Sequence, residues 1–378
     1  MKKQFLYGVL VCINMAFGLV QCADPAGGSA AAFESVAERV AARRRAIATP
    51  MHDDSCELWL TRRRAQLMEH IDKEQEFVRL SSPFLSDSGV ITALIRAHER
   101  GVCVTVKVGA CARGLERLQA AGIEAEVVKG LHAKMVITSQ ATILGSDNWS
   151  QFSRIRDTEV AARVKHKRRS FADQSAAAFN SLRADAVHRA TPKSTPKKPT
   201  IARYSIGYMA ERLRRFITEK GAGNSADIFS MTFNSVQVVE VIEEIYSQCA
   251  EGERPRIRLF LDRSALTHRD LLDRMLHAGG DSIEIYLFNI SGDHKLFGSI
   301  PNIMHQKALV RTLHAGTDRV ERHVILPTGN LTSQSHNELN LTLDLPGAAD
   351  IHQSLSECAD SYARSDEWTR YETKAEDE

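Results

Sequence analysis

Hydrophobic positions along the chain switch between a period of two residues, typical of strands, and a period of about 3.6, typical of helices. In the first half this pattern predicts, in order, helix 58–76, strand 77–80, helix 90–100, strand 102–108, helix 115–121, strand 123–128, and strands 135–137 and 142–144. Ser86 and Asp87 can cap the second helix, and Gly101 can end it. Alternating strands and helices predict an α/β unit on a mixed sheet.

The second half repeats this order of elements. The expected elements are helix 209–219, strand 227–233, helix 236–250, strand 257–261, helix 269–278, strand 283–288, and strands 308–310 and 324–326. Two units with one order of elements predict an internal duplication. Between them, residues 191–199 hold three prolines and no apolar period, which indicates an extended linker or exposed loop.

These patterns divide the chain into six segments. They are a signal peptide 1–22, an N-terminal arm 23–56, a first unit 57–190, a Pro/Lys linker 191–203, a second unit 204–365 and an acidic tail 366–378. The first segment starts with Lys2-Lys3 and continues with an apolar stretch, which is typical of a bacterial export signal. We therefore expect a periplasmic or secreted protein. The alternatives are an uncleaved anchor and a lipid anchor at Cys22.

The composition is that of an ordinary globular protein. Of 378 residues, 43% are hydrophobic, 25% charged and 6% aromatic, which excludes a disordered, collagenous or multi-span membrane chain. The net charge is only +2, but residues 163–203 hold 11 Lys and Arg against Asp173 and Asp185. This basic segment 163–203 can bind nucleic acid or an anionic membrane surface. It can equally be a solvated helix face.

Cysteine and histidine spacing gives no sign of a bound metal. Two of the seven cysteines lie within the leader, no Cys-x-x-Cys pair exists, and no histidine cluster has zinc-ligand spacing. We expect no cofactor and no metal. Disulfides are possible in an exported chain, but the sequence defines no framework for them.

Each half contains one copy of a polar motif. The motif is His-x-Lys before an apolar strand, then Asn-x-Ser/Thr, then Glu. The first copy comprises His132, Lys134, Asn148, Ser150 and Glu159, with Ser146 in the Gly-Ser-Asp-Asn turn; the second comprises His305, Lys307, Asn330, Thr332 and Glu338. One His-x-Lys occurs easily by chance, but the same ordered set in both duplicated halves does not. Surface histidines at strand ends are the alternative interpretation.

Two such copies facing each other would suit phosphodiester chemistry. One imidazole can attack phosphorus and form a phosphohistidine, while the other protonates the leaving oxygen and later activates water. The two Lys supply positive charge, and the two Asn with the hydroxyl residues supply donors to the non-bridging oxygens. Glu159 and Glu338 can each hold a histidine in the correct tautomer.

With these residues the sequence resembles the phospholipase D superfamily, whose repeated motif is H-x-K-x4-D followed by G-S-x-N. The resemblance covers residues 58–345 and implies two α/β/α units with mixed sheets, related by pseudo-twofold symmetry, with one active site between them. It also implies metal-independent phosphodiester hydrolysis or transfer, with His132 as nucleophile and His305 as acid.

The chain departs from the motif at several positions. Ser139 and Thr312 stand where the motif has Asp, and Thr328-Gly329-Asn330 stands where G-S-x-N is expected. The spacing from His to Asn is 25 residues in the second copy against 16 in the first, an insertion that we place at 313–321. A degenerate second copy is therefore an alternative.

The sequence favours an exported phosphodiesterase that acts as a monomer on phospholipid head groups. The leader supports a lipid substrate, because an exported enzyme meets membranes first. A metal-independent nuclease of the same superfamily and a catalytically degenerate protein that binds phosphate or lipid remain alternatives.

Overall fold

The structure is a computed structural model that describes most of the chain between residues 56 and 373. The described residues are 56–60, 64–109, 114–151, 159–166, 169–182, 199–203, 206–219, 221, 223–288, 306–318, 320–331, 339–343 and 349–373. The expected signal peptide 1–22, and the arm 23–56 up to its last residue, lie outside these ranges.

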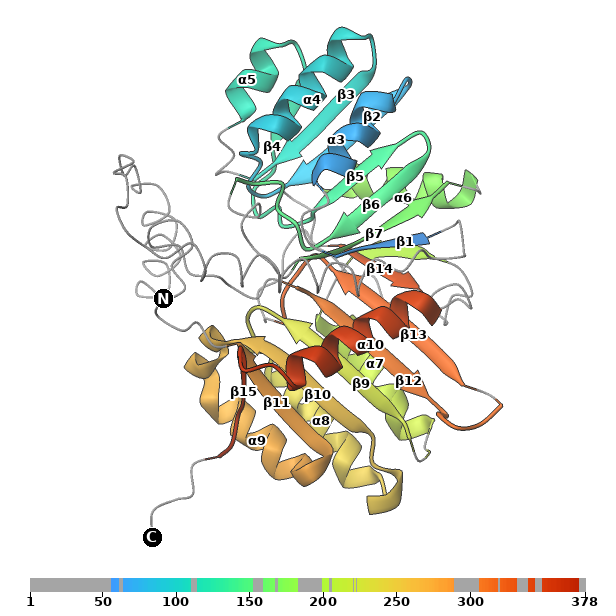
Figure 1. The fold of residues 1–378 in the computed structure, drawn as a ribbon, viewed down its shortest axis with the longest axis vertical. Helices are drawn as coiled ribbons and strands as arrows, with labels where there is room; N and C mark the ends of the chain where they lie inside the picture. Colours follow the sequence, from blue (N-terminus) through green and yellow to red (C-terminus); the bar gives the residue numbers. More distant parts are fainter. Residues whose placement is uncertain are drawn as a thin grey trace, which may run out of the picture. The chain divides into compact units, whose positions relative to one another are not determined.

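The first half forms a mixed seven-stranded sheet with helices on both faces (Figure 1). Its strands are β1 (Cys56–Leu60), β2 (Phe77–Ser82), β3 (Cys103–Val108), β4 (Glu124–Val127), β5 (Met135–Thr138), β6 (Ala141–Gly145) and β7 (Val160–Lys165). Its helices are α3 (Arg64–Lys73), α4 (Ser88–Glu99), α5 (Leu115–Ala120) and α6 (Arg169–Ser181). The strand order is β1-β7-β6-β5-β2-β3-β4. Strands β2, β3 and β4 are parallel, and the other neighbours are antiparallel.

The second half forms an eight-stranded sheet. Its strands are β8 (Thr200–Arg203), β9 (Ser225–Ser230), β10 (Arg256–Asp262), β11 (Ile283–Phe288), β12 (Ala308–Leu313), β13 (Glu321–Pro327), β14 (Leu339–Leu343) and β15 (Trp368–Arg370). Its α-helices are α7 (Ile206–Thr218), α8 (Val236–Gln248), α9 (Arg269–Gly279) and α10 (Ala349–Ala363), and short 3-10 turns cover Glu251–Glu253, Arg263–His268 and Gly280–Ser282. The strand order is β15-β11-β10-β9-β12-β13-β14-β8.

The two sheets have the same topology. Read from the opposite edge, the second sheet repeats the first strand for strand, with β8 in place of β1, β14 of β7 and β9 of β2, and with β15 added beyond β11. Parallel and antiparallel pairs also fall at equivalent places. The predicted internal duplication and the tandem α/β/α fold class are therefore confirmed.

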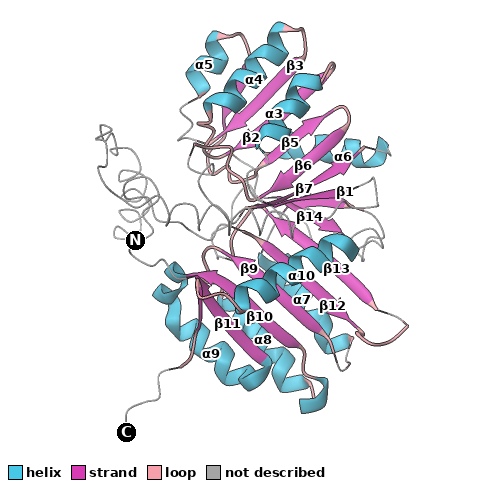
Figure 2. Cartoon of the chain, in the orientation of Figure 1, coloured by secondary structure: helices cyan, strands magenta, loops and turns pink. Residues whose placement is uncertain are grey.

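Three hydrophobic cores hold these layers together. One packs α3, α4 and α5 against one face of the first sheet, and another packs α7, α8 and α9 against one face of the second (Figure 2). The third core contains the remaining faces of both sheets together with α6 and α10. Because residues of both halves share this core, each half buries apolar surface that it could not cover alone.

Side-chain caps begin the second helix of each half. The Asp87 carboxylate accepts the Val90 N–H at 2.9 Å before α4, and the Ser235 hydroxyl accepts the Val238 N–H at 3.2 Å before α8. The cap predicted at Asp87 is confirmed. The cap of the first half, Asp87, carries a carboxylate, whereas the cap of the second half, Ser235, is neutral.

Three segment boundaries differ from the sequence-based prediction. Residues 56–60 form strand β1, where we expected the last residue of the arm and the start of helix 58–76. The linker 191–203 ends earlier, because Thr200–Arg203 pair with β14. The tail 366–378 begins inside the fold, because Trp368–Arg370 pair with β11. All three are edge strands whose partners lie far away in sequence, so no local pattern marks them.

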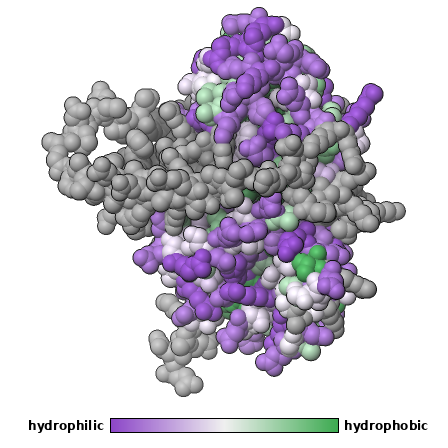
Figure 3. Space-filling model, turned by 45° about the vertical axis from the view of Figure 1, so that its right-hand side comes forward, coloured by the Kyte–Doolittle hydropathy of each residue, from purple (hydrophilic) through white to green (hydrophobic). Residues whose placement is uncertain are grey.

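The described surface carries few large apolar side chains. It is largely hydrophilic in the view of Figure 3, and the exposed large hydrophobic residues in the described ranges are Val127 and Val236. No disulfide joins Cys56, Cys103, Cys249 and Cys358, the cysteines in the described ranges. None of the described helices has the length and hydropathy that a membrane crossing requires.

Candidate active site

The first motif copy precedes strand β5. His132 is half-buried and Lys134 is fully buried, whereas Ala133 between them packs into the shared core. The side chains of His132 and Lys134 lie on the same side, since Nζ of Lys134 is 3.1 Å from Nδ1 of His132.

The ammonium group of Lys134 lies where the two halves meet. Its Nζ donates to the carbonyl oxygen of His132 at 2.6 Å and to that of Thr328, from the second half, at 3.1 Å. It also lies 3.1 Å from Nδ1 of His132. Strand β6 also contacts β13 and β14 of the second half, and β7 contacts β13. The structure thus brings the first copy of the motif directly against the second.

The second copy is described only in part. Lys307 precedes β12 and is buried, with Gln306 buried beside it, and Asn330 is half-buried at the end of the loop after β13. His305, Thr332 and Glu338 lie outside the described residues, so their predicted roles remain predictions.

The Gly-Ser-x-Asn turn recurs in the second half with Thr328 in place of Ser146. Ser146 donates its N–H to Val160 O at 2.8 Å and accepts the Val160 N–H on its hydroxyl at 2.9 Å. Thr328 makes the same two bonds with Leu339, at 2.9 and 3.0 Å. The sequence places Thr328-Gly329-Asn330 where G-S-x-N is expected, and these bonds put Thr328 at the position of Ser146.

The residue before each of these hydroxyls also differs between the halves. A Cβ on Gly145 would overlap the carbonyl oxygen of Val160 and the backbone of Ala161, so β6 and β7 approach closely only because glycine stands there. Gly145 also donates its N–H to Lys134 O at 3.3 Å. Pro327 occupies the equivalent place in β13 and has no N–H to donate.

Glu159 joins the site through the serine of the turn. The Ser146 hydroxyl donates to the Glu159 carboxylate, which is 4% exposed. This bond fixes the Ser146 hydroxyl, and it gives Glu159 a role in shaping the turn. Its predicted contact with His132 remains a prediction.

Asn148 is held by its backbone. Its carbonyl oxygen accepts a hydrogen bond from the Ser82 hydroxyl, and the residue is 5% exposed. Within the described part of the chain, the side-chain Oδ1 of Asn148 has no hydrogen-bond partner. A buried amide with an unused acceptor can bind a ligand, with Oδ1 accepting a hydrogen bond and Nδ2 donating one. Ser150, the other predicted residue of this turn, is also buried.

Ser139 and Thr312, which stand where the motif has Asp, are each hydrogen-bonded to a residue outside the motif. The N–H and hydroxyl of Ser139 both donate to the buried Glu74 carboxylate, at distances between 2.8 and 3.0 Å. In the second half, the Thr312 hydroxyl lies 2.9 Å from Nε2 of His352. In the first copy, a carboxylate from outside the motif therefore ties down the far end of the motif strand.

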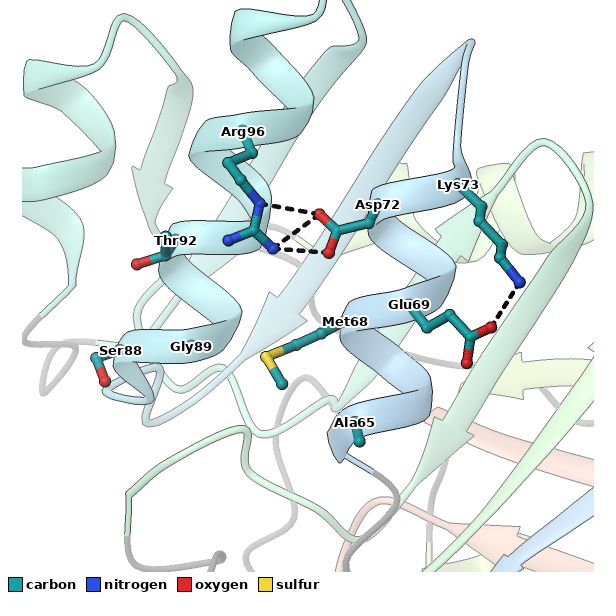
Figure 4. Close-up of a pocket in the computed structure, with 9 residues that line it drawn as sticks. All are labelled: Ala65, Met68, Glu69, Asp72, Lys73, Ser88, Gly89, Thr92 and Arg96. Atoms are coloured by element: carbon teal, nitrogen blue, oxygen red, sulfur yellow. Dashed lines mark hydrogen bonds and ion pairs between the residues drawn. The ribbon is translucent and has the colours of Figure 1, made fainter.

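A separate surface groove lies between α3 and α4. It has a volume of about 630 Å³ and is lined by Ala65, Met68, Glu69, Asp72, Lys73, Ser88, Gly89, Thr92 and Arg96 (Figure 4). Within the groove, Arg96 of α4 donates three hydrogen bonds of 2.7–3.2 Å to the Asp72 carboxylate of α3. None of the lining residues belongs to either motif copy. Among the described residues, no group of three or more His, Cys, Asp or Glu side chains has a metal-binding arrangement.

Comparison with known proteins agrees with this architecture. Residues 67–183 match a family model described as "Cardiolipin synthase, PLD-like domain". A phosphatidylserine synthase from Haemophilus influenzae has a similar structure, with a TM-score of 0.60 at 12% identity over 88% of this chain and 91% of that chain. A polyphosphate kinase from Porphyromonas gingivalis matches with a TM-score of 0.58 at 13% identity over 84% of this chain.

This chain spans about half of that kinase, since the match covers 48% of the kinase chain. The curated proteins contain no match to the sequence. At such low identities the structural likeness establishes the fold, and the family match covers the first half. The family match over residues 67–183 and the phospholipase D-like fold of both halves agree with the resemblance of this sequence to the phospholipase D superfamily.

Proposed function

We propose that this protein is an exported phosphodiesterase that hydrolyses phospholipid head groups, or transfers them to an alcohol, through a phosphohistidine on His132. The observation that carries the proposal is the bond from Lys134 Nζ to Thr328 O at 3.1 Å, because it joins the two motif copies. The resemblance to the superfamily supports phosphodiester chemistry in general. The lipid substrate and export are the finer parts of the proposal.

In the first step, a ring nitrogen of His132 attacks phosphorus and forms an N–P bond while the bond to the leaving oxygen breaks. His305 donates the proton that this oxygen needs. In the second step His305 accepts a proton from water, whose oxygen attacks phosphorus, and the N–P bond breaks to release His132. An alcohol in place of water gives transfer.

The other site residues stabilise charge. Lys134 and Lys307 place two buried ammonium groups beside the non-bridging oxygens, and Asn148 and Asn330 add amide donors. Burial strengthens such interactions, because the surrounding dielectric constant is lower than that of water. These groups can supply the positive charge that a metal ion supplies in other phosphodiesterases.

Three features support a lipid substrate. The family description matched in the first half names cardiolipin synthase, and one protein of the same fold is a phosphatidylserine synthase. The expected export signal would also carry the protein to a compartment in which it meets membrane lipids. The basic segment 163–203 instead favours nucleic acid. Within it, however, Arg163 belongs to β7 and lies 3.5 Å from Glu57, and residues 167–168 and 183–198 lie outside the described ranges.

The test is incubation of the protein with labelled phosphatidylcholine, cardiolipin and single-stranded DNA, each in the presence of EDTA. We expect release of a head group from at least one lipid and no cleavage of DNA. Cleavage of DNA alone would replace the lipid assignment with the nuclease. Activity lost on chelation and restored by zinc or magnesium would contradict the metal-free mechanism. Binding of lipid without turnover of any substrate would identify a degenerate binding protein.

A further inference from the structure

The backbone of the turn that carries Asn148 is held at every carbonyl. We call Asn148, Trp149 and Ser150 the asparagine turn. The Asn148 carbonyl accepts from the Ser82 hydroxyl, and the Trp149 carbonyl accepts the N–H groups of Ser86 and Asp87 at 3.4 and 3.2 Å. The Ser150 carbonyl accepts from the Arg64 guanidinium at 2.9 Å. Three separate scaffold segments therefore fix this turn.

The turn needs such support because its backbone is strained. Trp149 has a φ of 49°, in the left-handed region that bulky residues rarely adopt. Its side chain is 2% exposed and packs in the core beneath α3, α4 and α5. A relaxed backbone at Trp149 would move Asn148, the adjacent residue, whose Oδ1 is buried and has no partner in the described part of the chain.

Arg64 and Asp87 link this turn to two helices. Arg64, the first residue of α3, forms an ion pair with Asp87, and the side chains are only 15% and 5% exposed. The same Asp87 carboxylate caps α4 through the Val90 N–H, while the Asp87 N–H binds Trp149 O. The forked guanidinium can bind Asp87 and Ser150 O at once, which a lysine ammonium does less rigidly.

The second half lacks this charge at the equivalent place. Ser235 stands where the first half has Asp87 and caps α8 with a neutral hydroxyl. Asn234 N–H binds Leu331 O at 3.0 Å, in place of the bonds to Trp149 O. Leu331 is not among the described residues with positive φ, which outside glycine are Trp149 and His314. The ion pair therefore accompanies the strained turn only in the first half.

We propose that Arg64 and Asp87 are positioning residues that hold the Asn148 side chain against the non-bridging oxygens of the substrate phosphate. This role rests on the proposed function, because it presumes phosphodiester turnover at this site. Neither side chain touches the substrate. They act by fixing the backbone of the asparagine turn and with it the Asn148 side chain. Their loss should therefore lower kcat, because a small displacement of a donor weakens its stabilisation of the transition state.

The test compares Arg64→Met, Arg64→Lys and Asp87→Ser with wild type on an activated p-nitrophenyl phosphodiester. Asp87→Ser copies the residue of the second half and keeps a helix cap. We expect kcat to fall about 10- to 100-fold in Arg64→Met and Asp87→Ser, with KM within about threefold of wild type, and Arg64→Lys to recover part of the loss. The matched control is Arg96→Met, which breaks the exposed Arg96–Asp72 pair between the same two helices (Figure 4) and should leave kcat unchanged.

A double-mutant cycle separates positioning from general structural weakening. Asn148→Ala already removes the side chain that Arg64 positions, so adding Arg64→Met to it should lower kcat by less than about twofold. If the losses of kcat in the two single variants multiply in the double variant, the proposal is overturned. A wild-type kcat in folded Arg64→Met or Asp87→Ser protein would overturn it as well. If wild type itself turns over no phosphodiester, the proposed function fails instead. Circular dichroism and the unfolding midpoint provide the folded fraction by which each kcat is corrected.

Discussion

At the scale of single residues, Lys134 connects the two halves chemically. It is fully buried and binds one carbonyl from each half, His132 O and Thr328 O. A buried ammonium is costly to desolvate, so this chain maintains it by giving it several acceptors. Its ammonium group lies 3.1 Å from Nδ1 of His132, which puts a positive charge beside the attacking group of the proposed mechanism.

Replacement of Lys134 by Met should lower kcat about 100- to 1000-fold, because the transition state loses a preorganised positive charge. The measurement is kcat and KM on a p-nitrophenyl phosphodiester. Lys107→Met is the matched control, since Lys107 is also buried in the first half but binds Leu182 O and Glu126. It should retain wild-type kcat per folded molecule. Equal losses in the two variants would show that Lys134 acts only through stability.

At the scale of elements, the hydrogen bonds at the missing motif Asp explain how strand β5 keeps its place. Burial disfavours the charged form of Glu74, but hydrogen bonds from Glu76, Ser139 and Gln75 outweigh it and hold the pKa of Glu74 below its usual value. In the second half, Asn224 has the comparable role, because its side chain accepts the His314 N–H at 2.7 Å and donates to Glu219 O at 2.6 Å. Both halves thus tie the turn after the motif strand to the segment before the central strand.

Glu74→Gln should therefore lower the free energy of unfolding by about 1–3 kcal/mol near pH 7, because the N–H donors lose a charged acceptor. A carboxylate with a lowered folded pKa stabilises the protein above its unfolded pKa of about 4.5, and this stabilisation disappears as the pH falls through the folded pKa. The difference between wild type and variant should shrink accordingly in urea titrations from pH 7 to pH 3. Glu69→Gln, at an exposed position, should leave stability unchanged at pH 7. A pH-independent difference for Glu74→Gln would contradict this account.

The buried His352, which contacts Thr312, gives the second half its own contribution to the pH dependence of stability. Burial, with the charge of Arg322 nearby, lowers the pKa of His352 to about 4. Between pH 6.5 and about 4 the unfolded chain therefore binds a proton at His352 that the folded chain does not, so stability falls as the pH falls. His352→Gln should remove this part of the pH dependence, up to about 3 kcal/mol. Parallel stability profiles of wild type and His352→Gln would show that His352 contributes nothing to it.

The sequence predicted central strands and their helices better than edge strands. Strands such as β10 are buried along almost their whole length and show an apolar run, whereas β1, β8 and β15 are short and depend on partners far away in sequence. Helix α6 was not predicted, because it lies in the basic segment 163–203 and buries few apolar side chains. Its buried face is Phe171, Ser175 and Phe179, a narrow stripe with a helical spacing of four residues.

The extra residues of the second motif copy lie in the turn between β12 and β13 and in these two strands, which agrees with the insertion predicted at 313–321. Strands β12 and β13 have 6 and 7 residues where β5 and β6 have 4 and 5, and the turn between them is longer as well. The clamp around the asparagine turn could not be predicted in this way. It joins Arg64, Asp87 and Ser150, which only the folded structure brings together.

At the scale of the whole molecule, the two duplicated halves share one core and bring their motif copies into contact. The shared core contains residues of both sheets, and the two motif copies meet at Lys134 and Thr328. We therefore expect the site to form within a single chain, with the protein active as a monomer. Each half supplies one of the two histidines that the proposed mechanism needs.

Mixing of two inactive variants tests whether the site forms within one chain. His132→Ala and His305→Ala, unfolded and refolded together, should remain as inactive as either variant alone toward a natural lipid substrate. A site built between two chains would instead regenerate wild-type pairs in part of the mixture. Recovery of about a quarter of wild-type activity would therefore contradict a single-chain site. Refolded wild type is the control for recovery.

The central claim is that His132 carries the phosphoryl group while His305 acts as the acid. It is tested most directly by trapping base-stable, acid-labile label on the protein from a labelled p-nitrophenyl phosphodiester, whose leaving group needs no proton. We expect label on wild type and on His305→Ala, whose loss on natural substrates should be about 10²- to 10⁴-fold, and none on His132→Ala. Label on His132→Ala but not on His305→Ala would reverse the two roles, and an active wild type that never becomes labelled would contradict the covalent mechanism.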